Sequence, residues 1–216
     1  MSDKVDWEEI ARRSNEAFDL AASTAAEPNM AVKWGNPQTQ YFRFSELVKY
    51  LDLNDPRKTL LDVGCGNGEL VKFLNLAGYR GQYRGCDINA QLLEQARNRF
   101  PDAAFERVDL LNADAKVSER FDYVVMSGLF NADCGQTVQW IHQMLMAMYE
   151  KAEEVLVFNA VSTHVNTRED GMFYLDPSRL LEFCIENLSR RVTVAHHNLR
   201  FNFTVAVYRH EGWRSV

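Results

Sequence analysis

The sequence lacks the features that mark several classes of protein. No apolar run comes near the roughly 20 residues needed to cross a bilayer, and residues 1–6 show neither the basic nor the apolar region of a secretory signal. Lysine and arginine never form a cluster longer than two residues, and the 216-residue chain has a formal net charge of −6. Because affinity for nucleic acid grows with the number of neutralised phosphates, we expect neither a nucleic-acid partner nor a membrane partner.

Cysteine is scarce and is not arranged for disulfides or zinc. The chain has four cysteines, with no Cys-x-x-Cys pair and no histidine at zinc spacing. No trio of acidic residues suggests another metal site. We therefore expect no metal, free thiols and a cytoplasmic protein; the thiols are Cys65, Cys86, Cys134 and Cys184.

The most informative stretch that is present covers residues 59–69. An apolar run ending at Val63 predicts a buried parallel strand. Glycines follow at alternate positions, 64, 66 and 68, and residues 69–78 are typical of a helix. A strand, a tight glycine turn and a helix N-terminus bring the backbone close to a ligand. The pattern predicts a nucleotide-like cofactor, although a glycine turn without a ligand has the same local signature.

The glycine spacing argues against a dinucleotide. The dinucleotide fingerprint requires a third glycine at position 69 or 71, and these positions hold Glu69 and Val71. Glu69 would also place a carboxylate where a pyrophosphate should bind. A nicotinamide cofactor is therefore disfavoured.

The segment Asp-Val-Gly-Cys-Gly-Asn-Gly, residues 62–68, resembles motif I of the class I S-adenosylmethionine-dependent methyltransferases, Asp-x-Gly-x-Gly-x-Gly. An acidic loop suits a cofactor that carries a sulfonium and an ammonium but no phosphate. The resemblance implies S-adenosylmethionine as the cofactor, bound by Asp62, Gly64, Cys65, Gly66, Asn67 and Gly68.

Two further acidic residues follow predicted strands. Asp87 closes a strand over 82–86, about 20 residues after the first motif glycine, where a carboxylate can accept hydrogen bonds from both ribose hydroxyls; a helix N-cap is the alternative. Ile88 then lies where it can cover one face of an adenine. Asp109 and Leu110 follow a strand over 104–108. In the family resembled, residues there meet the adenine amino group and ring, while a simple turn would also favour Asp109.

The fourth strand, residues 121–126, ends at Ser127 and Gly128. Ligands of open α/β sheets bind beyond the carboxyl ends of the strands, so we expect Ser127 and Gly128 to face the cofactor and Phe130 and Asn131 to face the methyl acceptor. Family members that methylate amino groups of DNA bases or protein amides carry Asn/Asp-Pro-Pro-Tyr/Phe here. The Ser-Gly-Leu-Phe of this chain argues against those substrates.

The alternation of predicted strands and helices indicates an α/β fold with a doubly wound, mostly parallel sheet of seven strands. It comprises residues 53–216, the methyltransferase domain, and residues 1–52 form a helical N-terminal extension. In the family resembled, the last strand inserts antiparallel. The remaining predicted helices cover 5–22, 38–51, 90–99, 135–150 and 176–188, and the remaining strands cover 154–160, 191–196 and 201–208.

In small-molecule members of the family resembled, such an N-terminal extension often folds over the cofactor cleft. Residues 34–44 resemble a Trp-Gly…Gln…Arg-Phe pattern in a bacterial subgroup of these enzymes. The resemblance implies that Trp34, Gln40 and Arg43 contact the acceptor. Trp34 and Phe44 as ordinary core contacts, with Arg43 as a surface charge, remain the alternative.

Methyl transfer is a single displacement that mainly requires positioning, and a hydroxyl or ammonium acceptor also needs a base. His164 follows the strand over 154–160, with Tyr174 and Arg168 nearby in sequence. We therefore predict His164 and Tyr174 as catalytic residues and Arg168 as a substrate contact. A packing or surface role for His164 is the alternative.

The sequence thus predicts methyl transfer from S-adenosylmethionine to an oxygen or nitrogen of a small-molecule acceptor. Two rivals remain. The first is another use of the same cofactor, such as aminocarboxypropyl transfer or cyclisation, which would release methylthioadenosine in place of S-adenosylhomocysteine. The second is a module that keeps the fold and lacks catalysis.

Overall fold

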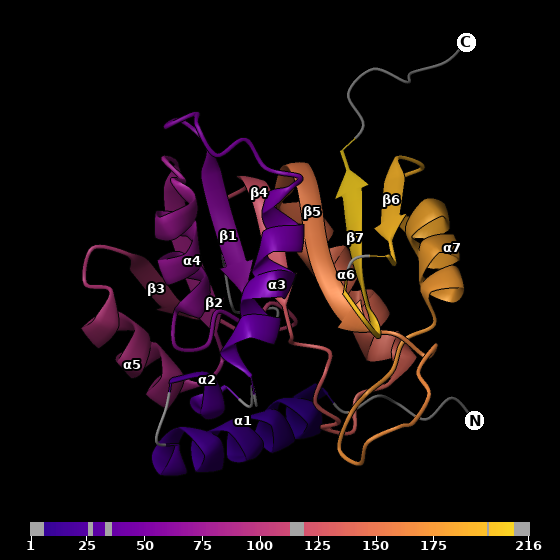
Figure 1. Ribbon diagram of the computed structural model, residues 1–216, viewed down its shortest axis with the longest axis horizontal. Coiled ribbons are helices and arrows are strands. Elements are labelled where there is room, and N and C mark those ends of the chain that lie inside the picture. Colours follow the sequence, from indigo (N-terminus) through magenta and orange to yellow (C-terminus); the bar gives the residue numbers. More distant parts are fainter. Residues whose placement is uncertain (1–6, 26–27, 33–35, 113–118, 198, 210–216) are drawn as a thin grey trace.

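A computed structural model describes residues 7–25, 28–32, 36–112, 119–197 and 199–209. Within these residues the centre is a seven-stranded sheet of order β3-β2-β1-β4-β5-β7-β6 (Figure 1). Strands β1 to β5 pair in parallel, and β7 pairs antiparallel with both β5 and β6. The predicted fold class is confirmed. The strands are β1 (Thr59–Val63), β2 (Gln82–Asp87), β3 (Ala104–Arg107), β4 (Phe121–Ser127), β5 (Ala152–Val161), β6 (Val192–Ala195) and β7 (Asn202–Tyr208).

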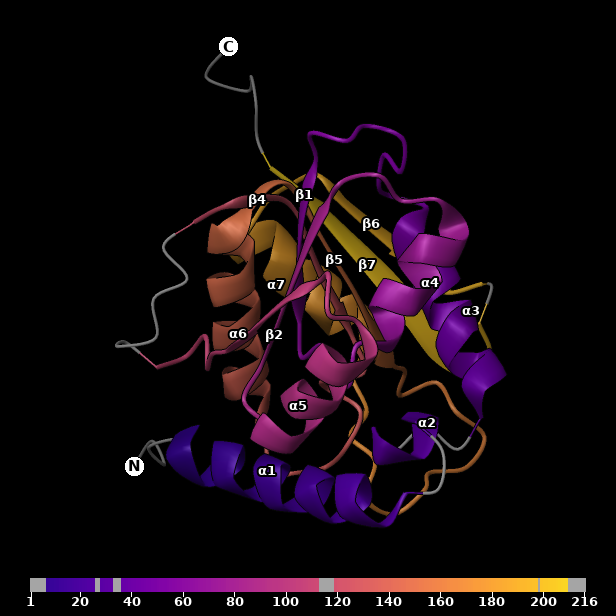
Figure 2. The ribbon, with the colours of Figure 1, turned by 90° about the vertical axis from the view of Figure 1, so that its left-hand side faces the viewer.

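The central strands are apolar on both sides because helices cover both faces of the sheet. Leu60 belongs to a core cluster beneath α3 (Pro37–Val48) and α4 (Glu69–Ala77). Leu61, its neighbour in β1, belongs to the cluster beneath α6 (Val138–Lys151) and α7 (Pro177–Asn187). Figure 2 shows the two helix pairs on opposite sides of the sheet. A third cluster joins α4, α5 (Ala90–Arg99) and β3.

Local sequence signals set several helix starts. Asn36 and Asn89 accept hydrogen bonds from backbone N–H groups two or three residues later, as N-caps do. Asp176 caps α7 in the same way, with Pro177 as its first residue. This confirms the predicted start of that helix. Between the two predicted N-terminal helices the structure adds the short helix α2 (Pro28–Ala31), which starts at a proline, a residue favoured in a first helical turn.

The helix α1 (Trp7–Thr24) lies across the carboxyl edge of the sheet, at the bottom of Figures 1 and 2. Ile10 is its one buried residue among those described. The Asn89 side chain fixes α1 to the sheet edge by donating to Asp19 Oδ1 over 2.7 Å and to the carbonyl of Asn15 over 3.5 Å. This places α1 over the edge where ligands of such sheets bind.

Candidate functional site

The turn after β1 has the conformation that only glycine adopts readily. Gly64, Gly66 and Gly68 have φ values of +72°, +54° and +81°, in the left-handed region. A Cβ atom on Gly66 would stand 2.8 Å from Cγ1 of Val32. The turn is tied to β2, because the N–H groups of Gly64 and Cys65 donate to the carbonyl of Cys86 over 2.8 and 3.1 Å. The three glycines therefore add no side chains of their own at the carboxyl end of β1.

Asp87 at the end of β2 faces this turn. Its two carboxylate oxygens accept hydrogen bonds from the N–H of Gly66 over 2.8 Å and the N–H of Asn89 over 2.9 Å. Burial raises its pKa above the ordinary aspartate value, and these backbone hydrogen bonds oppose the rise. The alternative of Asp87 as a helix N-cap is wrong, because Asn89 caps α5.

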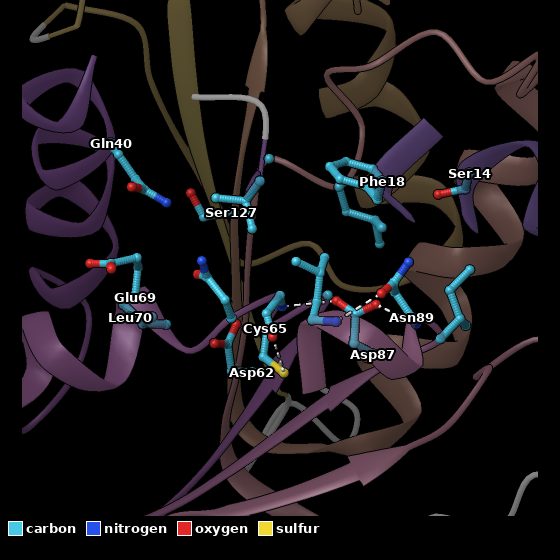
Figure 3. Close-up of a pocket in the computed structure, with 18 of the residues that line it drawn as sticks. Ser14, Phe18, Gln40, Asp62, Cys65, Glu69, Leu70, Asp87, Asn89 and Ser127 are labelled. Atoms are coloured by element: carbon cyan, nitrogen blue, oxygen red, sulfur yellow. Dashed lines mark hydrogen bonds between the residues drawn. The ribbon is translucent and has the colours of Figure 1, made fainter. Parts of the chain in front are cut away.

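Two cavities open on either side of Asp87, and both are roofed by α1. The first, here called the glycine-turn cavity, has a volume of about 700 Å³ including its open mouth (Figure 3). The second, the Asp109 cavity, measures about 670 Å³ on the same basis. They share Ser14, Gly64, Asp87, Ile88 and Leu129. The two cavities are therefore neighbours at the end of β2.

The Asp109 cavity lies at the end of β3 and is largely apolar. Asp109 and Leu110 line it together with Val108 and Ile88. An oxygen of Asp109 also accepts the N–H of Leu111 over 3.0 Å. Asp109 is therefore a turn residue and a cavity residue at once, so its two sequence interpretations are compatible.

The glycine-turn cavity is acidic. Asp62, Glu69 and Asp87 line it, and no Lys, Arg or His is among its described lining residues. Burial raises the pKa of Asp62 to about 7, although the Tyr83 hydroxyl donates to this carboxylate over 2.7 Å. Glu69 is neutralised by an ion pair with Arg99 of α5. The cavity therefore favours a ligand that carries positive charge.

Of the other residues predicted for the turn, two line the glycine-turn cavity and one caps a helix. Cys65 and Asn67 are buried and line the same cavity. Gly68 is the N-cap of α4. Burial raises the thiol pKa of both Cys65 and Cys86, which makes these thiols poor nucleophiles.

Helix α3 supplies one wall of the glycine-turn cavity through Gln40, which is 4% exposed. Its Oε1 accepts no hydrogen bond from the residues that the structure describes. Arg43, one turn later, is 5% exposed, and burial lowers the pKa of its guanidinium to about 9. The alternative of Arg43 as a surface charge is wrong. Phe44 is a core residue, and Trp34 lies outside the described residues.

A hydrogen-bonded pair stands at the ends of β4 and β5. Ser127 and Asn159 are register partners, and the Ser127 hydroxyl donates to Oδ1 of Asn159 over 3.2 Å. The Asn159 Nδ2 donates to the carbonyl of Arg43 over 3.4 Å. Ser127 and Gly128 both line the glycine-turn cavity, so the end of β4 faces the cavity as expected.

The remaining predicted residues are not among those lining either cavity. Phe130 is 1% exposed and packs edge to face against Trp140 and Phe158. The carbonyl of Asn131 accepts the N–H of Phe173 over 2.8 Å, which places the 162–175 loop beside the segment after β4.

Three candidates lie on that loop. The ring of His164 is 5.9 Å from that of His196, and the hydroxyl of Tyr174 accepts the N–H of Glu169 over 2.8 Å. The guanidinium of Arg168 lies 5.3 Å from the centre of the Tyr174 ring. The roles assigned to these three residues stay predictions.

Several cavity residues were missed by the sequence analysis. Ser14, Asn15 and Phe18 of α1 line the glycine-turn cavity. The amphipathic pattern of this segment was the only signal, and it did not say which surface the helix covers. Asn159 lies inside an apolar strand, where its polar side chain was the available clue.

The described residues contain neither a metal site of clustered ligands nor a membrane-spanning helix. They contain no group of three or more His, Cys, Asp or Glu side chains arranged to hold a metal ion. Within the same residues, the helices are too short or too polar to cross a membrane.

Comparisons with known proteins agree with this geometry. A family model described as a methyltransferase domain matches residues 61–150. A Mycobacterium tuberculosis protein that bears a methyltransferase name is 28% identical over 152 residues, which are 68% of this chain and 90% of that protein. The malonyl-[acyl-carrier protein] O-methyltransferase of Acetivibrio thermocellus is 33% identical over 116 residues, 52% of this chain but only 39% of the relative.

Among solved structures, the magnesium protoporphyrin IX methyltransferase of Synechocystis with bound S-adenosylmethionine has a TM-score of 0.65. The match covers 97% of this chain and 100% of that one at 16% identity, a level that establishes a shared fold.

Proposed function

We propose that the chain is a class I S-adenosylmethionine-dependent methyltransferase, as the methyltransferase-domain model and the similar proteins support, and that it transfers the methyl group of this cofactor to an oxygen or nitrogen of a small molecule. The observation that carries the proposal is the pair of cavities joined at Asp87. The largely apolar Asp109 cavity and the acidic glycine-turn cavity lie on the two sides of the Asp87 carboxylate.

The residues present fit S-adenosylmethionine. The apolar walls of the Asp109 cavity suit an adenine, with Ile88 against one face and Asp109 and Leu110 at its polar edge. Asp87 stands between the cavities, where it would hold the ribose hydroxyls. The acidic glycine-turn cavity, with Asp62, would hold the methionine portion. Bound there, the cofactor supplies an electrophilic methyl group on a positively charged sulfur.

The chain's own contribution is positioning and charge. The glycine turn leaves the backbone bare beside the reacting centre, and α1 covers both cavities so that water is limited. Asp62 is more easily ionised when a positive charge stands in the cavity. The buried carboxylates and the roofing helix therefore favour the positively charged cofactor over its neutral product.

Methyl transfer to a hydroxyl or ammonium also requires that the acceptor lose its proton. His164 and Tyr174, both in the 162–175 loop, remain the candidate catalytic residues. We keep Gln40, Arg43, Asn131 and Arg168 as candidate acceptor contacts, whereas Phe130 is a core residue.

The name of the Acetivibrio relative specifies O-methylation of malonyl-[acyl-carrier protein], which supports oxygen as the acceptor atom and a small acyl group as its carrier. The sequence of the β4 end supports the same conclusion, because it lacks the motif of DNA and protein amide methylation. None of the described cysteines forms a disulfide, which supports the expected cytoplasmic location.

Calorimetric titration with S-adenosylmethionine, S-adenosylhomocysteine and NAD tests the cofactor site. We expect about micromolar binding of the first two and none of NAD. A screen of small acceptors that detects S-adenosylhomocysteine then tests the reaction. Release of methylthioadenosine instead would identify aminocarboxypropyl transfer or a related reaction, and binding without any product would favour a non-catalytic module.

A further inference from the structure

The hydroxyl of Tyr83 reaches Asp62 from outside the glycine-turn cavity. Tyr83 lies in β2, and its ring packs edge to face against Phe105 with the ring centres 5.9 Å apart. It is not among the described residues that line either cavity. Its hydroxyl donates to Oδ2 of Asp62 over 2.7 Å. Asp62 itself lines the glycine-turn cavity (Figure 3), and its carboxylate accepts no other hydrogen bond from the described residues.

Strand β2 leaves space for this hydroxyl beside Asp62. Gly85 is the register partner of Asp62 in the parallel pair of β1 and β2. Tyr83 stands two residues earlier, so its side chain lies on the same face of the sheet as position 85. A Cβ atom on Gly85 would stand 2.8 Å from the Tyr83 hydroxyl oxygen. The hydroxyl therefore occupies the place that a side chain at position 85 would take.

The described residues that line the cavity place no positive charge beside Asp62. They include no Lys, Arg or His, and Asp62 is 3% exposed. Val125, its register partner in β4, cannot titrate. The titratable groups around it are Cys65 of the turn, Cys86, Asp87 and Tyr83 of β2, and Glu69 of α4, which is paired with Arg99. Among the described residues, Tyr83 is therefore the one donor that stabilises the ionised carboxylate.

The protonation state of this pair is set by burial. Burial raises the pKa of Asp62 to about 7, although the hydrogen bond from Tyr83 opposes the rise. Burial also raises the pKa of the Tyr83 hydroxyl well above its ordinary value, so Tyr83 keeps its proton and remains a donor. In the protein without cofactor, a substantial fraction of Asp62 is therefore protonated at neutral pH. A positively charged group in the cavity favours the ionised form.

We propose, on the premise of the methyl transfer proposed above, that Tyr83 is a positioning residue that holds one oxygen of Asp62 so that the ionised carboxylate receives the cofactor ammonium. Asp62 carries a proton in part of the cofactor-free molecules. On pairing with the ammonium it loses this proton, whose O–H bond breaks and which passes to the solvent. Cofactor binding is thereby coupled to proton release, and Tyr83 sets the pH range over which the affinity changes.

Calorimetric titration of the full chain with S-adenosylhomocysteine, in buffers of different ionisation enthalpy, counts the released protons. At about pH 7 the wild type should release about half a proton more than Asp62→Asn, because about half of the Asp62 carboxyls are protonated there. Tyr83→Phe should release more than the wild type, since loss of the hydrogen bond raises the pKa of Asp62 further. 5′-Methylthioadenosine, which lacks the ammonium, should show no such release with any of the three proteins.

The pH dependence of affinity separates this role from a merely structural one. Relative to Asp62→Asn, the wild type should bind S-adenosylhomocysteine about ten-fold more weakly at about pH 6 than at about pH 8. In Tyr83→Phe the decrease should begin at a higher pH, and raising the pH should restore the affinity. Tyr123→Phe is the matched control, because it removes a buried hydroxyl from β4, which also pairs with β1, and leaves Asp62 untouched.

Equal proton release by the wild type and Asp62→Asn would overturn the proposal. An affinity of Tyr83→Phe that is lower by the same factor at every pH would also overturn it, as would the same pH shift in Tyr123→Phe. Circular dichroism establishes that each variant is folded. If Tyr83→Phe does not fold, Gly85→Ala, which displaces the hydroxyl, should shift the pH range in the same direction. Failure of the wild type to bind S-adenosylhomocysteine at all would instead refute the proposed function on which the coupling rests.

Discussion

Replacement of Asp62 by asparagine should stabilise the protein without its cofactor, and more so at higher pH. Asp62 is buried beneath the glycine turn, and this burial raises its pKa from 3.8 to about 7. At about 1.36 kcal/mol for each pKa unit, keeping this carboxylate ionised in the folded state costs about 4 kcal/mol. The asparagine side chain of the variant carries no such charge but can still accept the hydrogen bond from the Tyr83 hydroxyl.

The direction in which the stability of the wild type changes with pH follows from the raised pKa of Asp62. The folded pKa is raised above the unfolded value, so the contribution of Asp62 to stability is fully present below about pH 4 and is lost as the pH rises through about 7. The stability advantage of Asp62→Asn over the wild type should therefore grow by about 2–3 kcal/mol between about pH 5 and about pH 8. The same variant should bind S-adenosylmethionine more weakly, because it lacks a negative charge near the sulfonium and ammonium.

Urea unfolding of the cofactor-free protein, followed by circular dichroism at both pH values, measures the difference. Tyr83→Phe is the matched control. It removes the hydrogen bond that lowers the pKa of Asp62, so the folded pKa should rise further. The decrease in stability caused by ionisation of Asp62 should then continue to a higher pH than in the wild type. An Asp62→Asn advantage that is the same at both pH values would refute the reasoning, since it would show that Asp62 does not titrate in this range.

Further substitutions test the other parts of the site. Asp87→Ala should weaken S-adenosylmethionine binding by about 1.5–3 kcal/mol, the range for a lost hydrogen bond to a charged group; calorimetry with unchanged affinity would disprove the ribose role. Gly64→Ala should cost about 1–2 kcal/mol of stability in thermal unfolding, because of the positive φ at this residue, and an unaltered transition would contradict that. Asn89→Ala should lower stability by at least about 1 kcal/mol, because it removes the cap of α5 and the hydrogen bonds that hold α1 at the sheet edge, whereas an equally stable variant would show that neither helix depends on this side chain. His164→Ala should slow turnover and leave cofactor affinity unchanged; normal turnover with the true acceptor would return this residue to a structural role.

The cofactor half of the site was accessible from sequence because its residues are local to strand ends. Gly64, Asp87 and Asp109 each follow a predicted parallel strand, and parallel strands bring their carboxyl ends to one edge. The antiparallel last strand was implied by the family resemblance and is confirmed by the structure, which also supplies the order of the strands. Motif and spacing therefore determined the cofactor and the fold.

The remaining half depended on contacts between residues far apart in the chain. Nothing in the amphipathic pattern of α1 placed Ser14 and Phe18 over the cavities, because amphipathicity defines a buried face and leaves open the surface that it covers. The fixed hydrogen bond of Ser127 needs Asn159 and a carbonyl of α3. The raised pKa of Asp62 needs burial produced by the whole fold. The sequence by itself therefore determined which strand ends form the cofactor site. Tertiary packing decided that α1 covers the cavities and that the pKa of Asp62 is raised, because both depend on contacts between distant parts of the chain.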